Sequence, residues 1–244
     1  MNAIVIGTDN ITLDDLIAIA RRGFRLRLNR ESEKRIIAAR NLIEKWVEEE
    51  KTVYGVTTGF GALSDVNISR KDTRQLQVNI LKSHAAGVGD YFNEESVRAM
   101  MALRIKDLAR GHSGIRLTTV NRLVDLLNQG VWPVVPEKGS VGASGDLAPL
   151  AHLSLVLLGQ GEAFYQGKKM SGAEILEKLG MKPIDLEAAE GLALVNGTQV
   201  MTGLGALCVH DAVRLSKLTD VAAAMSLEVL MGSKTEFDSR IHQV

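Results

Sequence analysis

The sequence predicts a mainly α-helical protein. Aromatic residues account for 4% of the 244 residues and proline for only 4 of them, a composition that favours long helices over a β-sandwich. Hydrophobic side chains recur every three or four positions over several long stretches, as on the buried face of an amphipathic helix. With 45% hydrophobic and 24% charged residues, the chain has a globular composition and can bury a core without disulfides or metal.

The first predicted helix begins after Thr12, whose hydroxyl can cap it while Asp14 and Asp15 occupy the first turn, and it ends at Gly23. A second helix is expected over residues 30–50, where charged residues fill the positions between regularly spaced apolar ones. The apolar stripe of this helix is expected to face the core and consists of Ile36, Ile37, Ala39, Ile43, Trp46 and Val47.

Serine, threonine and asparagine are preferred helix caps. Three further helices are expected to begin at such residues, which are Ser69, Asn93, and Thr118 or Thr119. The last of these helices is expected to end at Gly130. Residues 161–170 resemble a β-hairpin with Gly167 at its turn, the only clear strand signal in the chain. Ser171 is expected to cap the short helix that follows.

Near its C-terminus the sequence predicts one long helix. Residues 198–231 contain no proline, and apolar residues recur there at alternating spacings of three and four, at Leu215, Leu218, Ala222, Met225 and Val229. Such a helix is roughly 50 Å long at ~1.5 Å per residue, longer than a compact domain of this size. Because it carries no charge between Val221 and Leu227, it has to be buried on every side, and too little sequence follows Met231 to cover it. We therefore expect a partner chain or an oligomer.

Charge and cysteine content restrict the partners and the compartment. The 29 basic and 29 acidic residues give a net charge of zero, so no overall field attracts nucleic acid or an anionic membrane. Cys208 is the single cysteine, which excludes an internal disulfide and fits the cytoplasm. The N-terminus lacks the basic region and the long apolar stretch of a secretory signal, and no run of eighteen apolar residues occurs. We expect a cytoplasmic protein with neither a membrane nor a nucleic-acid partner.

Common metal and nucleotide motifs do not occur in the sequence. The five histidines lie far apart, and none has a partner at the spacing of zinc ligands. The glycines of GFGALS at 59–64 lack the third glycine of a dinucleotide fingerprint, and the spacing from Gly161 to Lys168 does not match a P-loop. No metal or nucleotide cofactor is expected.

The stretch GSVGASGDLAPL at 139–150 is the most unusual segment, because four residues of very small side chain precede Asp146 and an apolar helix. One interpretation is a flexible turn in which Ser144 or Asp146 caps that helix. The other is chemical. The Gly145 nitrogen, which has no Cβ beside it, can attack the Ala143 carbonyl, and loss of two waters then leaves a conjugated five-membered ring.

Four segments resemble, in order, the N-terminal signatures of the histidine, phenylalanine and tyrosine ammonia-lyase family. They are YGVTTGFG at 54–61, SHAAGVG at 83–89, ASGD at 143–146 and NGT at 196–198. The resemblance covers the whole chain. It implies that Ala143, Ser144 and Gly145 cyclise to a methylidene-imidazolone (MIO) electrophile, which takes the place of pyridoxal phosphate in eliminating ammonia from an amino acid.

The resemblance also implies roles for single residues. Tyr54 matches the catalytic base that removes the β-proton of the substrate, and a phenol can do so at neutral pH only if nearby donors or cations favour the phenolate. Asn196 matches an asparagine placed beside the MIO group and the substrate. Asp146 is implicated in ring formation, with helix capping as the alternative.

The pair Ser83-His84 is similar to that of histidine lyases, where the imidazole contacts the substrate imidazole. This points to L-histidine as the substrate, with trans-urocanate and ammonia as products. Thr57 departs from that pattern, because histidine lyases usually have asparagine there and the string VTTGFG is familiar from phenylalanine lyases. A phenylalanine or tyrosine ammonia-lyase, or an aminomutase, therefore stays open.

By the same resemblance, residues 1–197 form an α-rich domain that bears the MIO group, and residues 198–244 begin a central helical bundle. Family members continue with the rest of the bundle, including an arginine that binds the substrate carboxylate, and assemble as tetramers. We therefore expect a C-terminal partner chain, a homo-oligomer, or both, whether the chain is a natural split subunit or a truncated one. A noncatalytic helical scaffold or regulatory subunit is the alternative from another class, although such a protein has no need of Tyr54 or the Ala-Ser-Gly run.

Overall fold

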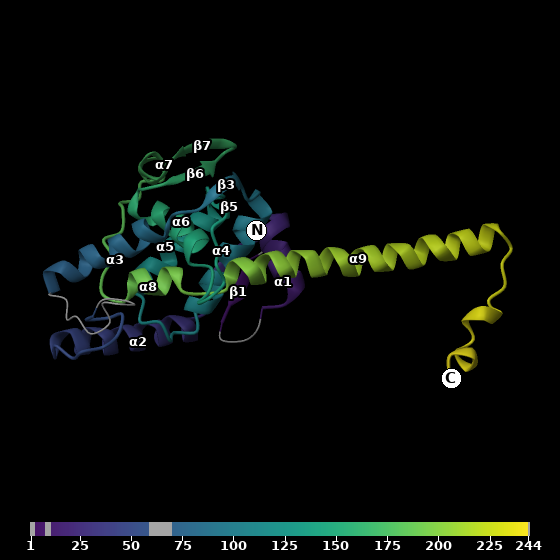
Figure 1. The fold of residues 1–244 in the computed structure, drawn as a ribbon, viewed down its shortest axis with the longest axis horizontal. Coiled ribbons are helices and arrows are strands. Elements are labelled where there is room, and N and C mark those ends of the chain that lie inside the picture. Colours follow the sequence, from purple (N-terminus) through teal and green to yellow (C-terminus); the bar gives the residue numbers. More distant parts are fainter. Residues whose placement is uncertain (1–2, 8–10, 59–69, 244) are drawn as a thin grey trace. The chain divides into compact units, whose positions relative to one another are not determined.

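The computed structural model describes residues 3–7, 11–58 and 70–243. Its internal contacts divide the chain into two compact units, Met1–Leu204 and Gly205–Val244. Helices make up most of the described residues, which confirms the prediction of a mainly α-helical protein (Figure 1). The expected domain boundary after residue 197 stays a prediction.

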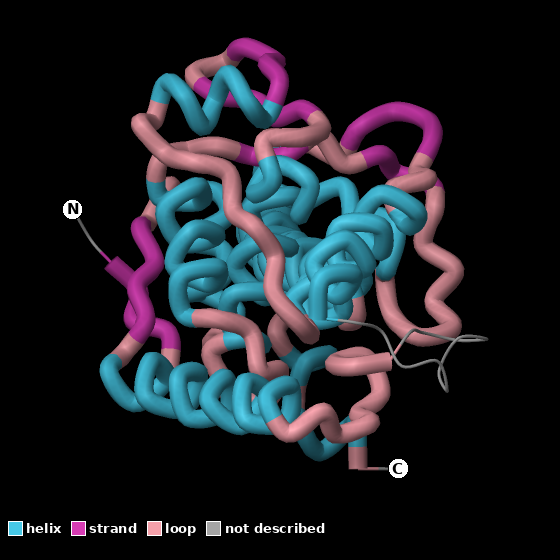
Figure 2. Tube along the Cα trace, turned by 90° about the vertical axis from the view of Figure 1, so that its left-hand side faces the viewer, coloured by secondary structure: helices cyan, strands magenta, loops and turns pink. Residues whose placement is uncertain are grey.

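The first unit contains eight helices and the start of a ninth in its described part. They are α1 (Leu13–Arg22), α2 (Arg30–Glu48), α3 (Arg70–His84), α4 (Glu94–Leu108), α5 (Leu117–Asn128), α6 (Leu147–Leu155), α7 (Gly172–Lys178), α8 (Glu190–Val195) and α9 (Gln199–Val229). Helices α3, α6 and α8 pack against one another, and α4 packs against α1 and α5. In both views of the first unit, α2 lies at one edge of this helical core and the α7 region at the opposite edge (Figures 1 and 2).

Short strands, seven in the described residues, surround the helices. They are β1 (Ala3–Ile6), β2 (Arg25–Leu28), β3 (Val88–Tyr91), β4 (Trp132–Pro133), β5 (Pro136–Lys138), β6 (Glu162–Tyr165) and β7 (Lys168–Ser171). Strands β1 and β2 are parallel, with α1 as the crossover between them, whereas β3–β5 and β4–β6–β7 are antiparallel. The hairpin at 161–170 is confirmed, and Gly167 has φ +74° at its turn.

That hairpin is not the only strand structure, so the expectation of a single β signal is wrong. The strands that it missed have two to four residues each, which is too short for an alternating pattern to be recognised. Tertiary contacts hold them in place. Trp132 on β4, for example, stacks on Phe164 of β6 with 4.0 Å between ring centroids.

Helix caps were predicted with mixed success. The hydroxyls of Thr12 and Ser171 accept the backbone N–H of residues three positions on, and the Asn93 side chain caps α4 in the same way. The expected cap at Thr118 or Thr119 is wrong, because Arg116, two or three residues earlier, stands at the N-cap position of α5. Ser69 lies outside the described residues.

The predicted apolar stripe of α2 is largely correct. Ile36 and Ile43 are buried, and Trp46 and Val47 pack on the hydrophobic cluster around Ile43. Ile37 differs from the prediction, since 46% of its surface is exposed. It follows Ile36 directly, and residues one position apart on a helix point about 100° apart.

The long C-terminal helix is confirmed as α9, whose 31 residues correspond to about 46 Å. In the second unit, taken by itself, apolar side chains of this helix are exposed, including Val213, Leu215, Leu218, Val221, Met225 and Val229. The stretch 190–229 is also long and apolar enough, by length and composition, to cross a membrane. This stretch contains no uninterrupted run of eighteen apolar residues, but its mean hydropathy is high in spite of isolated charged residues. Core helices of soluble proteins pass the same test.

Candidate active site

The Ala-Ser-Gly run lies in the loop between β5 and α6. Ala143 and Ser144 are exposed, whereas Gly145 is buried. The φ of Gly145 is +102°, and a Cβ built there would lie 2.4 Å from the carbonyl oxygen of Gly197. Only glycine fits this position. The close contact brings two of the four sequence motifs, ASGD and NGT, directly together.

Hydrogen bonds of Asp146 stabilise the contact between Gly145 and Gly197. Its backbone N–H donates to the Gly197 carbonyl at 2.6 Å. Its carboxylate is completely buried and accepts three hydrogen bonds, from the Ser140 hydroxyl at 2.7 Å and from the backbone N–H groups of Val200 and Met201, each at 3.0 Å. The two amides belong to the first turn of α9, where an anion is favoured by unpaired N–H groups and the helix dipole.

This geometry corrects one prediction. Asp146 stands at the N-cap position of α6, but its side chain makes no capping hydrogen bond to that helix. It caps α9 instead, because the Gly197 contact turns the carboxylate toward the α9 amides. The implied role of Asp146 in ring formation stays a prediction.

Asn196 and Gly197 connect α8 to α9. The Asn196 side chain is exposed and makes no hydrogen bond within the part of the chain that the structure describes, so its amide is available to a bound molecule. Behind it, the Gly197 Cα lies against the buried Arg104, since a Cβ there would be 2.3 Å from Arg104 Nη1. The loop therefore has an open side at Asn196 and a packed side at Gly197.

His84 ends α3 and is half-buried. Its Nδ1 lies 2.8 Å from the Ile80 carbonyl oxygen and 3.2 Å from the Ser83 hydroxyl. A carbonyl oxygen can only accept, so Nδ1 carries the proton in the neutral ring. Nε2 is then an acceptor, and it has no partner among the described residues. His84 thus offers a lone pair to a ligand that can donate a hydrogen bond.

The segment after His84 packs on the Ala-Ser-Gly loop. A Cβ on Gly139, at the start of that loop, would lie 3.0 Å from the Gly87 Cα. The Gly87 N–H donates to Nε2 of His152 on α6 at 3.0 Å. The SHAAGVG motif therefore contacts the start of the loop that carries ASGD, and ASGD in turn contacts NGT.

His152 was not singled out from the sequence as a site residue. Burial lowers its pKa, and acceptance of the Gly87 N–H at Nε2 also requires a neutral ring at that nitrogen. A histidine that falls among apolar residues of a helix is a weak signal, because it is equally typical of a packed core. Its partner, 65 positions away, could not be found from spacing.

Tyr54 lies in the turn of residues 54–57 and is 58% exposed. The turn is anchored by Val56, which packs with Ile43, Ala188 and Ala189. Ala189, which contacts Val56, immediately precedes α8, and the NGT loop follows that helix. The six residues of α8, a length of about 9 Å, therefore separate Ala189 from the NGT loop. The rest of the YGVTTGFG motif, residues 59–61, lies outside the described residues.

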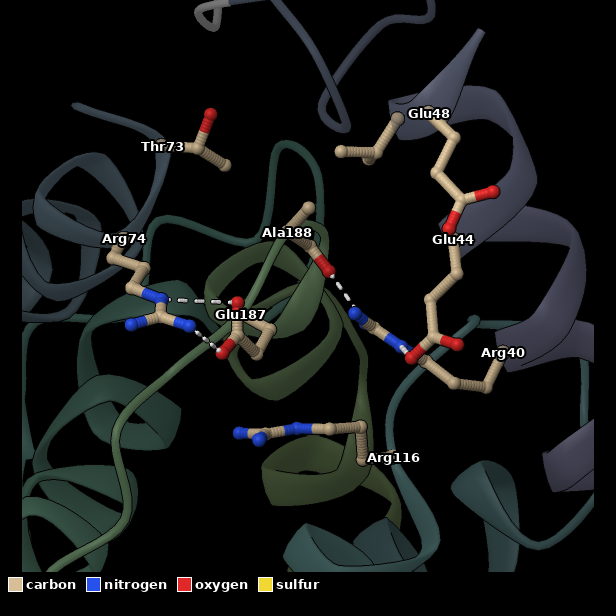
Figure 3. Close-up of a pocket in the computed structure, with 9 residues that line it drawn as sticks. Arg40, Glu44, Glu48, Thr73, Arg74, Arg116, Glu187 and Ala188 are labelled. Atoms are coloured by element: carbon tan, nitrogen blue, oxygen red, sulfur yellow. Dashed lines mark hydrogen bonds and ion pairs between the residues drawn. The ribbon is translucent and has the colours of Figure 1, made fainter. Parts of the chain in front are cut away.

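A cleft of about 680 Å³ lies beside Ala188, one of the residues that pack against Val56 (Figure 3). It is lined by Arg40, Glu44, Val47, Glu48, Thr73, Arg74, Arg116, Glu187 and Ala188. Its arginines are already paired. Arg74 binds Glu187 through two hydrogen bonds, and Arg40 donates to Glu44 and to the Ala188 carbonyl. Among the described residues that line this cleft, none was predicted for the site, and each arginine is already paired, so these residues offer a ligand no free cation.

Glu190, next to this cleft, is completely buried and forms an ion pair with Arg116 at 2.6 Å. It also accepts from the Thr119 hydroxyl and from the Glu187 N–H. These contacts fix the start of α8. Among the described residues, no group of three histidine, cysteine, aspartate or glutamate side chains is arranged to hold a metal ion.

Comparison with known proteins agrees with the motif geometry. A family model described as "Aromatic amino acid lyase" matches residues 11–244. Histidine ammonia-lyase of Alkaliphilus oremlandii is 52% identical over 244 residues, which are 100% of this chain and 48% of that protein. Histidine ammonia-lyase of Streptococcus gordonii is 52% identical over 236 residues, 97% of this chain and 46% of that protein.

Solved structures give the same result. Histidine ammonia-lyase from Trypanosoma cruzi superposes with a TM-score of 0.91 at 40% identity, covering 100% of this chain and 47% of that one. Pantoea agglomerans phenylalanine aminomutase superposes with a TM-score of 0.92 at 38% identity, covering 100% and 47%. The chain thus spans about half the length of the relatives that it matches.

Proposed function

Because the chain belongs to the aromatic amino acid lyase family, we propose that it is the N-terminal part of an ammonia-lyase that converts L-histidine to trans-urocanate and ammonia. The observation that carries this proposal is the close packing of Gly145 on Gly197, which joins the ASGD and NGT motifs and requires glycine at the attacking position. The names of the relatives at 52% identity support histidine as the substrate.

The electrophile is proposed to form from Ala143, Ser144 and Gly145. The Gly145 nitrogen bonds to the Ala143 carbonyl carbon, and the former carbonyl oxygen leaves as water with the two protons from the N–H groups of Gly145 and Ser144. A second water then takes the Ser144 hydroxyl and its Cα proton, which leaves an exocyclic methylidene. No oxidant is needed. The residues fit this product, since Ala143 and Ser144 are exposed and the backbone behind Gly145 is held by Gly197 and Asp146.

Once formed, the group supplies an electrophilic carbon for the substrate's amino nitrogen and so makes that nitrogen a better leaving group. Tyr54 is proposed to take the β-proton. As the Cβ–H bond breaks, its electron pair forms the Cα–Cβ double bond, and the C–N bond breaks with its electrons leaving on nitrogen. An exposed phenol on a glycine-containing turn suits a base that approaches the substrate from a loop. Asn196, with a free amide that can donate and accept, is proposed to bind the substrate near the electrophile.

His84 is proposed to recognise the substrate ring by accepting a hydrogen bond from it at Nε2. Since Nε2 is the acceptor, the ring has to present a donor, which an imidazole N–H or a phenol O–H does and a phenyl ring does not. The geometry therefore favours histidine or tyrosine over phenylalanine. The phenylalanine aminomutase neighbour, at TM-score 0.92, and Thr57 support the second candidate, an aminomutase or lyase acting on another aromatic amino acid.

The remaining half of the catalytic unit is proposed to come from a C-terminal partner chain or segment within a tetramer-like homo-oligomer in the cytoplasm. The relatives are about twice as long as this chain, and the second unit exposes apolar residues along α9. Covering these side chains would contribute about 25 cal/mol per Å² of buried apolar area. The partner is also expected to supply the cation for the substrate carboxylate.

Two measurements test the proposal. The intact mass of the purified chain should fall short of the sequence mass by two waters, and Ser144→Ala should abolish the deficit. The chain should then be combined with the C-terminal segment of the Alkaliphilus oremlandii relative and supplied with histidine, tyrosine or phenylalanine. Urocanate formed only in the combination, and lost in Tyr54→Phe, supports the proposal. Cinnamate, coumarate or a β-amino acid favours the second candidate, and no product from any substrate contradicts both and favours a scaffold.

A further inference from the structure

Arg104 is a buried cation at the back of the NGT loop. It lies on α4, where the neighbouring Met100, Met101 and Ile105 are completely buried, and only 2% of Arg104 itself is exposed. Desolvation lowers its pKa to about 10, so the guanidinium remains charged at neutral pH. Removing such a charge from water is unfavourable, and the hydrogen bonds of the guanidinium have to offset that cost.

Those hydrogen bonds join the segments on both sides of the NGT loop. Nη2 donates to the Ala193 carbonyl near the end of α8, and Nη1 donates to Gln199 Oε1 at the start of α9, at 2.9 Å. Nη1 also pairs with Asp107 at 3.1 Å. A cation beside the last carbonyls of a helix is favoured by the helix dipole. Arg104 therefore ties α8 to α9 across residues 194–198.

Gly197 is held between this guanidinium and the Ala-Ser-Gly loop. On one side a Cβ would meet Arg104 Nη1 at 2.3 Å, and on the other the Gly197 carbonyl oxygen, carbon and nitrogen are the atoms that a Cβ on Gly145 would meet. The same carbonyl accepts the Asp146 N–H. A displacement of Gly197 would therefore be passed directly to Gly145.

We propose that Arg104 is a positioning residue for ring closure, which sets the place of the Gly145 nitrogen relative to the Ala143 carbonyl by holding Gly197 against Gly145. This inference rests on the proposed function, in which that nitrogen and carbonyl carbon form the new C–N bond and two waters leave. The required attack geometry is short-ranged, and a misplacement of about 1 Å can slow such a reaction by about a hundredfold. Arg104 touches none of the reacting atoms.

Arg98 on the same helix is a matched control. It is 5% exposed, donates to the carbonyls of Ile19 and Leu127, and has a pKa lowered by burial. Its contacts lie in other segments. Replacing either arginine by methionine removes a buried cation from α4 and leaves backbone carbonyls without a donor, so both variants should lose comparable stability.

The experiment measures the fraction of chain that lacks two waters, by intact mass, in the wild type, Arg104→Met and Arg98→Met. All proteins are produced and held at a temperature at which circular dichroism shows them folded. Arg104→Met should show a dehydrated fraction lower by about tenfold or more, whereas Arg98→Met should match the wild type. Equal fractions in the two variants, whether high or low, would overturn the proposal.

If Arg104→Met does not fold, the dehydrated fraction is measured in Gln199→Ala and should be lower than in the wild type. Gln199 is only half-buried, and its replacement removes the hydrogen bond between Arg104 and α9. An unchanged dehydrated fraction in that variant would overturn the proposal. A wild-type chain of full mass would contradict ring closure in this chain, and amide exchange then tests Arg104 separately. Asp146 N–H should exchange at least about tenfold faster in Arg104→Met than in Arg98→Met, and equal exchange would refute the positioning role.

Discussion

Gly145→Ala tests the steric basis of the site. At φ +102° an L-residue is strained by ~1–3 kcal/mol. Its Cβ would lie 2.4 Å from the Gly197 oxygen and 2.9 Å from the carbonyl carbon and nitrogen of the same residue, and relieving such overpacking costs a further ~1–3 kcal/mol. We expect the free energy of unfolding to fall by about 4 kcal/mol in total.

Gly142→Ala is the matched control. Gly142 lies in the same loop at φ +72°, and a Cβ built on it would have no atom within 4 Å, so its cost is confined to the backbone strain of about 1–2 kcal/mol. Both variants remove a glycine from the unfolded chain, and that effect cancels in the comparison.

The assay is urea and thermal unfolding with both variants in the Ser144→Ala background, where the ring cannot form and stability is measured free of it. At ~2–4 °C per kcal/mol for a domain of this size, Gly145→Ala should lower Tm by about 8–16 °C and Gly142→Ala by about 2–8 °C. With Ser144 restored, Gly145→Ala should keep the full sequence mass. Equal destabilisation by the two alanines would refute the claim that Gly145 packs directly on Gly197.

Three further outcomes are expected. Glu190→Gln should cost about 3–5 kcal/mol of unfolding free energy because it neutralises a completely buried carboxylate that is paired with the 26% exposed Arg116 side chain. Glu187→Gln, which removes the partner of an exposed arginine, should cost about 1 kcal/mol or less in the same urea titration. Burial lowers the pKa of His152, so below about pH 6.5 this side chain binds a proton more readily in the unfolded state than in the folded state. The free energy of unfolding therefore decreases as the pH falls below about 6.5. His152→Gln should make Tm less dependent on pH in this range, and an unchanged slope of Tm against pH would contradict this role of His152. Neutral His84 should appear as the Nδ1–H tautomer in long-range ¹H–¹⁵N NMR spectra, and a proton on Nε2 instead would remove the argument for a donor on the substrate ring.

Local sequence signals predicted the helices well. The Thr12, Asn93 and Ser171 caps act over three residues, and the apolar stripe of α2 repeats within one turn, so both are properties of neighbouring residues. The same locality explains the failures. Thr119 resembles a cap, but its hydroxyl binds the buried Glu190 carboxylate, 71 positions away.

The candidate site was predicted as a set of motifs rather than as an arrangement. Chemistry restricts the residue types, so the Ala-Ser-Gly run, Tyr54 and His84 could be recognised along the chain. Arg104 had a weak sequence signal, as one of two arginines among the buried apolar residues of α4. No spacing rule could link it to Gln199, 95 positions away.

By itself, the sequence determined the helical class, most helix starts, the long α9 and the reactive Ala-Ser-Gly segment, because each depends on side chains close together along the chain. Only the tertiary structure decided that Asp146 caps α9 rather than α6 and that Gly145 packs directly on Gly197. It also decided that His152 accepts a hydrogen bond from the segment that follows His84. Packing selects such partners, since a buried carboxylate, amide or ring nitrogen has to be satisfied by whichever group the fold brings within hydrogen-bond distance.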